Sequence, residues 1–216
     1  MTSFMPVFSA GSVLIIGRVS GYEYDIFISY ARRGSVQKWI LNHFHSKLKD
    51  CLADEIAPAP RIYIDRNMER AVHWPSSLQR ALLRSKIMLQ VLAPPYFESE
   101  WCRAEWQSMR AREEALGLTS IDAPQGLIYS LLYGDSDTFP SAAREVAWVD
   151  FKEFANPDMA FQKTEKYAAF HWKVRDVARD LAQLLPQVPE WRADWPIVEM
   201  PDPVLRPPTR MPRFGR

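Results

Sequence analysis

The sequence predicts an α/β protein of three layers, a flavodoxin-like fold in which helices cover both faces of a five-stranded parallel sheet. Five short runs rich in Ile, Val, Tyr and Phe alternate with segments of helical period, and this alternation requires right-handed crossovers between parallel strands. Several runs are apolar on both faces, which is typical of strands buried between two helical layers. The runs are residues 24–30, 61–65, 86–93, 126–133 and 146–151.

Four segments of helical period complete the pattern. The first follows Ser35, a residue type that caps helices. The second opens with the sequence WPSS, and the third begins near Ser99 and ends at Gly117, a residue favoured just past a helix. The fourth ends at Pro186. The first helix carries Val36, Ile40, Phe44, Leu48 and Cys51; the second Leu78, Ala81 and Leu82; the fourth Phe170, Val174, Val177, Leu181 and Leu184.

The length and the charge of the chain restrict its organisation and its partners. Its 216 residues suffice for one domain of roughly 150 residues with appendages. We expect an N-terminal extension at 1–22, a domain at 23–186 and a Pro-rich tail at 187–216, whose tryptophans indicate that its first part lies against the domain. The net charge of +1 predicts neither nucleic acid nor an anionic membrane as partner.

Cysteine and histidine usage predicts no metal site. Cys51 and Cys102 have no close spacing, which suits a reducing cytosol in which each thiol behaves as a small apolar group. His43 and His45 are two positions apart on a predicted helix and do not face each other. We therefore expect a cytoplasmic protein without a zinc pattern.

The strand order places two segments at one edge of the sheet. In folds of this kind the common order is 2-1-3-4-5, and ligands bind between strands 1 and 3, where the winding reverses. The turns that follow these strands are ARRGS (31–35) and PPYFESEWC (94–102). The stretch YFESEWCRAEW at 96–106 is therefore predicted to line a cleft.

Glu105 is the candidate functional residue of this stretch. On a helix that begins at Ser99 it shares a face with Trp101 and Cys102 and lies near the border of the buried surface. A solvated surface carboxylate is the alternative for a single glutamate on a helix. For the turn at 31–35, the alternatives are an anion site, such as one for a pyrophosphate, and solvated arginines.

Three motifs at matching intervals resemble a Toll/interleukin receptor (TIR) domain of the bacterial type. They are YDIFISYARR, the strand YID with its long loop, and S-x-WC-x-x-E at the start of the third helix. The resemblance runs from about residue 24 to 105, and the order of elements extends it to about residue 185. It implies that Glu105 is the catalytic residue of an enzyme that cleaves NAD+. It also implies nucleotide contacts at Tyr30, Ala31, Arg32, Arg70 and Trp101.

The implied chemistry needs only one carboxylate. Nicotinamide in NAD+ is already cationic and leaves as a neutral molecule, so no general acid is required, whereas other glycosidases need one. Negative charge near the ribosyl cation is the contribution expected of Glu105. Water then gives ADP-ribose, and attack by the adenine gives a cyclic isomer. NAD+ enters as the substrate, and no resident cofactor is expected.

The resemblance also implies self-association through TIR–TIR contacts, a separate sensor or effector protein, and a role in anti-phage defence or signalling. Two departures are visible: Val72 replaces a glycine frequent in the second loop, and Ala31 replaces an arginine of some active relatives. The main alternative is a non-catalytic TIR adaptor that works through contacts between domains. A nucleoside deoxyribosyltransferase of similar topology explains Glu105 but not the loop motifs.

Overall fold

The computed structural model describes residues 21–65, 74–118, 126–144 and 146–201. Five strands form a single sheet: β1 (Tyr24–Tyr30), β2 (Ile62–Ile64), β3 (Ser85–Leu92), β4 (Ile128–Leu132) and β5 (Trp148–Asp150). Their order is β2-β1-β3-β4-β5 and every neighbouring pair is parallel, which confirms the predicted topology. Each strand begins and ends within two residues of the run that predicts it.

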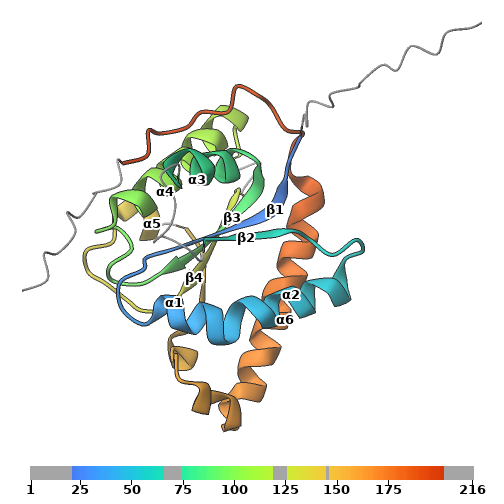
Figure 1. Ribbon diagram of the computed structural model, residues 1–216, viewed down its shortest axis with the longest axis vertical. Coiled ribbons are helices and arrows are strands. Elements are labelled where there is room, and N and C mark those ends of the chain that lie inside the picture. Colours follow the sequence, from blue (N-terminus) through green and yellow to red (C-terminus); the bar gives the residue numbers. More distant parts are fainter. Residues whose placement is uncertain (1–20, 66–73, 119–125, 145, 202–216) are drawn as a thin grey trace, which may run out of the picture.

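Helices cover both faces of the sheet (Figure 1). On one face lie α1 (Val36–Trp39), the π-helical turn η1 (Ile40–Phe44), α2 (His45–Glu55) and α6 (Lys166–Leu184). On the other lie α3 (Trp74–Leu83), α4 (Glu100–Leu116) and α5 (Ser141–Arg144). Short 3-10 turns follow β5 and α6: η2 (Lys152–Phe154), η3 (Met159–Lys163) and η4 (Leu185–Gln187).

The first predicted helix differs from its prediction in two ways. The five apolar residues that predict it are buried, but the π-helical turn η1 separates α1 from α2 within the segment predicted as one helix. Ser35 has helical backbone angles (φ −94°, ψ −9°), and its side chain makes no capping hydrogen bond. Its hydroxyl lies 2.7 Å from the hydroxyl of Tyr133 instead. The predicted cap at Ser35 is therefore wrong, because a capping side chain normally needs an extended backbone.

Helix α4 has the predicted ends. Ser99 is extended (φ −79°, ψ 117°), and its hydroxyl accepts a hydrogen bond from the Cys102 N–H at 3.3 Å. Gly117 takes the left-handed conformation (φ 66°) that ends many helices. Cys102 and Met109 are buried against the sheet. These ends fix the register of α4 and therefore the direction in which Glu105 points.

Residues 188–201 run along α3 and α4 (Figure 1). The indole N–H of Trp191 donates to the Leu83 carbonyl at 3.1 Å, and the Val198 N–H donates to the Ser108 hydroxyl at 2.9 Å. Trp195 is 5% exposed and lies over the Arg112 guanidinium. The first part of the Pro-rich tail therefore lies against the domain, as predicted.

Within the part of the chain that the structure describes, no helix combines the length and the apolar character needed to cross a membrane.

Candidate active site

A pocket of about 520 Å³ opens at the carboxyl ends of β1 and β3. The turn after β1 forms one wall and the start of α4 forms the opposite wall. This is the edge at which the strand order predicted a cleft. The lining includes Tyr30, Ala31, Arg32, Asp65, Trp101 and Glu105.

Glu105 lies inside this pocket with its side chain almost fully buried. The residue is 6% exposed. The Ser29 hydroxyl on β1 donates a hydrogen bond to Glu105 Oε2 at 2.6 Å. The sequence left a solvated carboxylate as the alternative, and the burial of Glu105 rules that alternative out.

Burial changes the acidity of Glu105. Loss of hydration disfavours the ionised form and raises the pKa of this carboxyl to about 7. The Ser29 hydrogen bond and the positive charge of Arg32 act in the opposite direction, whereas the nearby Asp65 adds to the increase. A carboxyl whose ionisation lies near neutral pH, in a pocket, is typical of a functional site.

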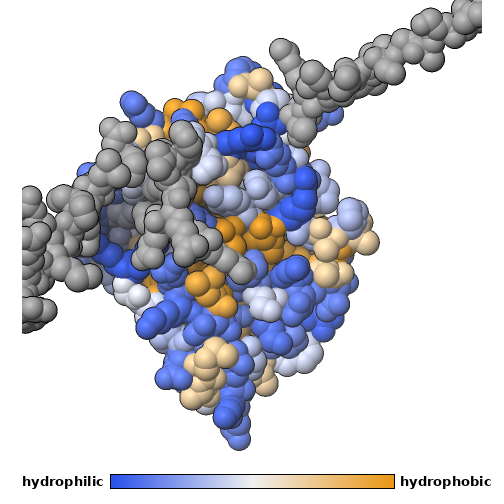
Figure 2. Space-filling model, viewed as in Figure 1, coloured by the Kyte–Doolittle hydropathy of each residue, from blue (hydrophilic) through white to orange (hydrophobic). Residues whose placement is uncertain are grey.

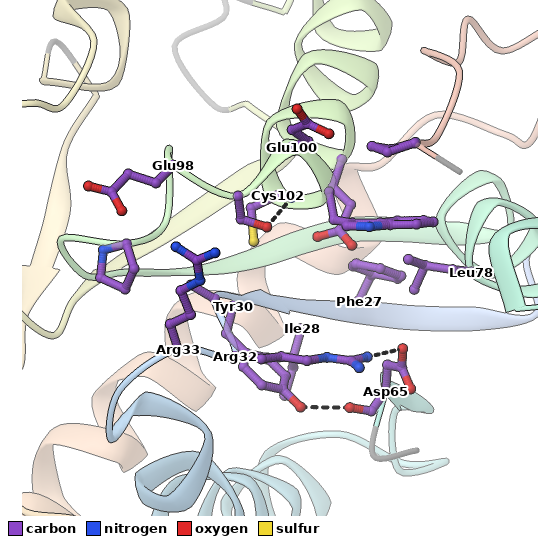
Figure 3. A pocket seen from close by; sticks show the side chains of 16 residues that line it. Phe27, Ile28, Tyr30, Arg32, Arg33, Asp65, Leu78, Glu98, Glu100 and Cys102 are labelled. Carbon is purple, nitrogen blue, oxygen red and sulfur yellow. Dashed lines mark hydrogen bonds and ion pairs between the residues drawn. The ribbon is translucent and has the colours of Figure 1, made fainter. Parts of the chain in front are cut away.

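Arg32 and Asp65 lie just after β1 and β2, and they meet at the rim of the pocket (Figure 3). The Arg32 guanidinium forms a close ion pair with the Asp65 carboxylate. The Tyr30 hydroxyl donates to the Asp65 backbone carbonyl at 2.6 Å. Arg33, which is exposed, extends from the same turn in a different direction (Figure 3). The pocket is thus lined by one guanidinium that pairs with Asp65 and acts on Glu105, and by a second, exposed one.

Comparison with known proteins assigns the family. The family model described as "TIR domain" matches residues 26–164. The chain belongs to the TIR domain family. None of the curated proteins searched matches the chain.

Solved structures with a similar fold include other TIR domains. The TIR domain of the Toll-related receptor TRR-2 from Hydra magnipapillata is 16% identical, with a TM-score of 0.46. The comparison covers 73% of this chain and 98% of that one. The TIR domains of the activated Roq1 resistosome, which recognises the pathogen effector XopQ, are 17% identical with a TM-score of 0.35. There the match covers 74% of this chain and 84% of that one.

The fold of this TIR domain brings together five of the six predicted site residues. Tyr30, Ala31, Arg32, Trp101 and Glu105 all line the pocket. Trp101 is half-buried and also packs against the core cluster beneath α3 and α4, so it supports the helix start while one part of it borders the pocket. Arg70 and Val72 lie outside the described residues.

Cys102 lines the same pocket but is not suited to nucleophilic chemistry. It is 3% exposed, and burial raises the pKa of its thiol well above the usual range. The thiolate needed for nucleophilic attack is therefore scarce at neutral pH. The structure agrees with the prediction that this thiol is part of the core.

Three residues of the site were missed from the sequence: Asp65, which lines the TIR-domain pocket, and Ser29 and Tyr96, which lie behind Glu105. Asp65 ends the predicted strand 61–65, and its place at the carboxyl edge beside Arg32 was a signal that could have found it. Ser29 lies two residues after Phe27 on β1, so both side chains point to the same face of the sheet, which is the face that α4 covers. Tyr96 lies in the turn after β3, and its hydroxyl contacts Ser29 at 2.6 Å. Neither contact has a signature in the sequence.

Proposed function

We propose that this TIR domain is an NAD+ nucleosidase that cleaves the bond between nicotinamide and ribose. The observation that carries the proposal is the Glu105 carboxyl, buried in a pocket at the switch point of the sheet and held by Ser29. Ligands of open α/β sheets bind at this point. The products are nicotinamide and either ADP-ribose or a cyclic ADP-ribose isomer.

In the proposed reaction the bond between ribose C1′ and the nicotinamide nitrogen breaks. Both electrons pass to the nitrogen, which becomes neutral, and positive charge develops on the ribose. A fixed carboxylate stabilises this charge more strongly inside a pocket than in water. Ionised Glu105 supplies that negative charge and accepts hydrogen bonds from the ribose hydroxyls. A water oxygen then bonds to C1′ and releases a proton, or an adenine nitrogen takes its place.

The arginines of the turn after β1 suit the pyrophosphate of the substrate. Arg33 is exposed at the pocket, and its guanidinium can bind two phosphate oxygens at once. Arg32 carries a charge that the Asp65 carboxylate partly balances. We therefore assign phosphate binding mainly to Arg33 and the support of the turn mainly to Arg32.

The test is incubation of the purified protein with NAD+, followed by chromatography of the products. Glu105→Gln removes the negative charge, and we expect nicotinamide release to fall at least 100-fold, as for loss of one electrostatic group in other enzymes. Glu114→Gln is the matched control, because Glu114 is exposed on the same helix. Equal and negligible release by all three proteins, at high concentration and with crowding agents, favours the adaptor function.

We also infer that activity depends on self-association and that the protein acts in bacterial anti-phage defence or signalling with a separate sensor or effector. The resemblance of the three sequence motifs to bacterial TIR domains supports this assignment. NAD+ depletion on assembly is a suitable output for such a system, because a monomer with low activity does not consume the NAD+ of the cell.

A further inference from the structure

A chain of hydrogen bonds under α4 ends on the carboxyl of Glu105. The Ser29 hydroxyl lies 2.6 Å from the Tyr96 hydroxyl and 2.6 Å from Glu105 Oε2. Ser29 is 1% exposed and Tyr96 is fully buried. Ser29 and Tyr96 do not line the pocket, so Ser29 contacts Glu105 from the interior of the protein and Tyr96 contacts Ser29 from behind.

The direction of these hydrogen bonds follows from the atoms. A serine hydroxyl has a single hydrogen, which Ser29 donates to Glu105. The contact between Ser29 and Tyr96 must therefore be donated by the Tyr96 hydroxyl. Burial raises the pKa of Tyr96 well above its usual value, so the phenol keeps its proton. Two successive donors thus point toward Glu105, which suits an ionised carboxylate.

The two donors are held by the rigid part of the fold. Ser29 is on β1, an interior strand paired with β2 and β3, in register with Gln90. Tyr96 lies in a turn closed by its own N–H, which donates to the Ala93 carbonyl at 2.8 Å. Its ring packs edge to face on Phe97 at 5.0 Å between centroids. The backbones that carry the two hydroxyls are therefore held in place by the sheet and by this turn.

We propose that Ser29, oriented by Tyr96, is a positioning residue that keeps the Glu105 carboxylate ionised and aimed into the pocket. The consequence for catalysis rests on the proposed NAD+ nucleosidase activity. The consequence for the ionisation of Glu105 does not, because it depends only on the contacts of the folded protein.

Other charged and titratable groups surround Glu105 and set the background of the titration. Arg32 favours the ionised form and Asp65 disfavours it. The groups that face Glu105 from the surrounding elements are Tyr30, Arg32, Tyr63, Asp65, Tyr96 and Cys102. The variants below leave the two charged residues in place, so a change in the ionisation of Glu105 reports the hydroxyl chain.

The experiment compares wild type with Ser29→Ala and Tyr96→Phe, each of which removes one hydroxyl. Loss of a hydrogen bond to a charged group raises the pKa of the carboxyl by about 1 to 2 units. We expect the pH at which nicotinamide release reaches half of its maximal rate to rise by that amount in Ser29→Ala and by less in Tyr96→Phe. At pH 7 this shift lowers the rate of Ser29→Ala about 5- to 50-fold, and the rate recovers above pH 9.

Ser130→Ala is the matched control. Ser130 is a buried serine on β4, separated from Ser29 in the sheet by Gln90, and we expect its substitution to leave the pH profile unchanged. A loss of rate in Ser29→Ala that is the same at every pH would overturn the proposal. Tyr96→Phe keeps the ring, so it tests the hydroxyl chain even if Ser29→Ala does not fold.

A second measurement needs no substrate. The protein is labelled with ¹³C at the glutamate carboxyls, and the Glu105 signal is assigned by its loss in Glu105→Gln. Its titration should move to higher pH in Ser29→Ala and Tyr96→Phe, and an unchanged titration would refute the proposal. If the wild type releases no nicotinamide while the titration moves as expected, the proposed function fails and the positioning role stands.

Discussion

At the scale of single residues, Glu105 makes folding less favourable at the pH where its negative charge is useful. Its folded pKa of about 7 is higher than the 4.5 of an ordinary glutamate. The folded state therefore keeps the proton to a higher pH than the unfolded chain does. Stability falls as the pH rises from about 4.5 to about 7 and is then constant with respect to this group.

Glu105→Gln removes this pH dependence because glutamine does not ionise. Each pH unit in the window changes the free energy of unfolding by about 1.4 kcal/mol, so the whole window corresponds to about 3 kcal/mol. We expect the variant to gain about that much over wild type between pH 4 and pH 8 in urea unfolding. Parallel stability curves for the two proteins across this range would contradict the burial of an ionisable Glu105.

The sequence predicts the face of α4 on which Glu105 lies, but not how deeply its side chain is buried. A helical period shows that Glu105 borders the buried stripe of Cys102 and Met109. How far it is buried depends on the neighbouring strand β1 and on the turn after β3, which supply Ser29 and Tyr96. Such contacts join residues 67 and 76 positions apart, and no local pattern records them.

At the scale of elements, the predictable parts were those with a local cause. The ends of α4 follow from Ser99 and Gly117, whose side-chain and backbone chemistry acts within one turn. The prediction that Ser35 caps the helix is wrong because its backbone is helical and its hydroxyl contacts Tyr133, which directly follows β4. The π-helical turn η1 also has no signature in the apolar spacing, since its residues keep the same buried face.

Residues 188–201 contact both α3 and α4, and we expect these contacts to stabilise the folded domain. Trp195 covers the buried Arg112, whose guanidinium donates to the carbonyls of Ser85 and Leu82. We expect Trp195→Ala to lower the free energy of unfolding by about 3 kcal/mol, as for other buried aromatic residues. Trp172→Ala is the control, because Trp172 is 57% exposed on α6 and should change stability by less than about 0.5 kcal/mol. If, in chemical denaturation, Trp195→Ala lowers the free energy of unfolding no more than Trp172→Ala does, the tail does not stabilise the domain.

At the scale of the whole molecule, strand β2 forms one edge of the sheet next to the pocket. Strand β2 is an edge strand whose three residues are half-buried. Figure 2 shows hydrophobic colour near the middle of this face, where Figure 1 places β2. An edge strand leaves one side of its backbone able to pair. Asp65, which holds Arg32 at the pocket, directly follows this strand, so contacts at the edge can reach the site.

If self-association activates the proposed nucleosidase, the rate per molecule rises with protein concentration. Inactive chains should then assist active ones, because they take part in the same assembly. We expect nicotinamide release by dilute wild type to increase several-fold when excess Glu105→Gln protein is added, whereas serum albumin at equal mass has no such effect. A rate that stays proportional to wild-type concentration, and is indifferent to the variant, would refute activation by assembly.

The ionisation of Glu105 links the fold of this TIR domain to its proposed chemistry. The most direct test is kcat/KM for nicotinamide release from NAD+ between pH 5 and pH 9, which reports the ionisation of the free enzyme. Because the charged carboxylate is the active form, the value should rise with pH through one ionisation centred near 7. Release that is absent at every pH, or that declines as Glu105 ionises, would contradict the account.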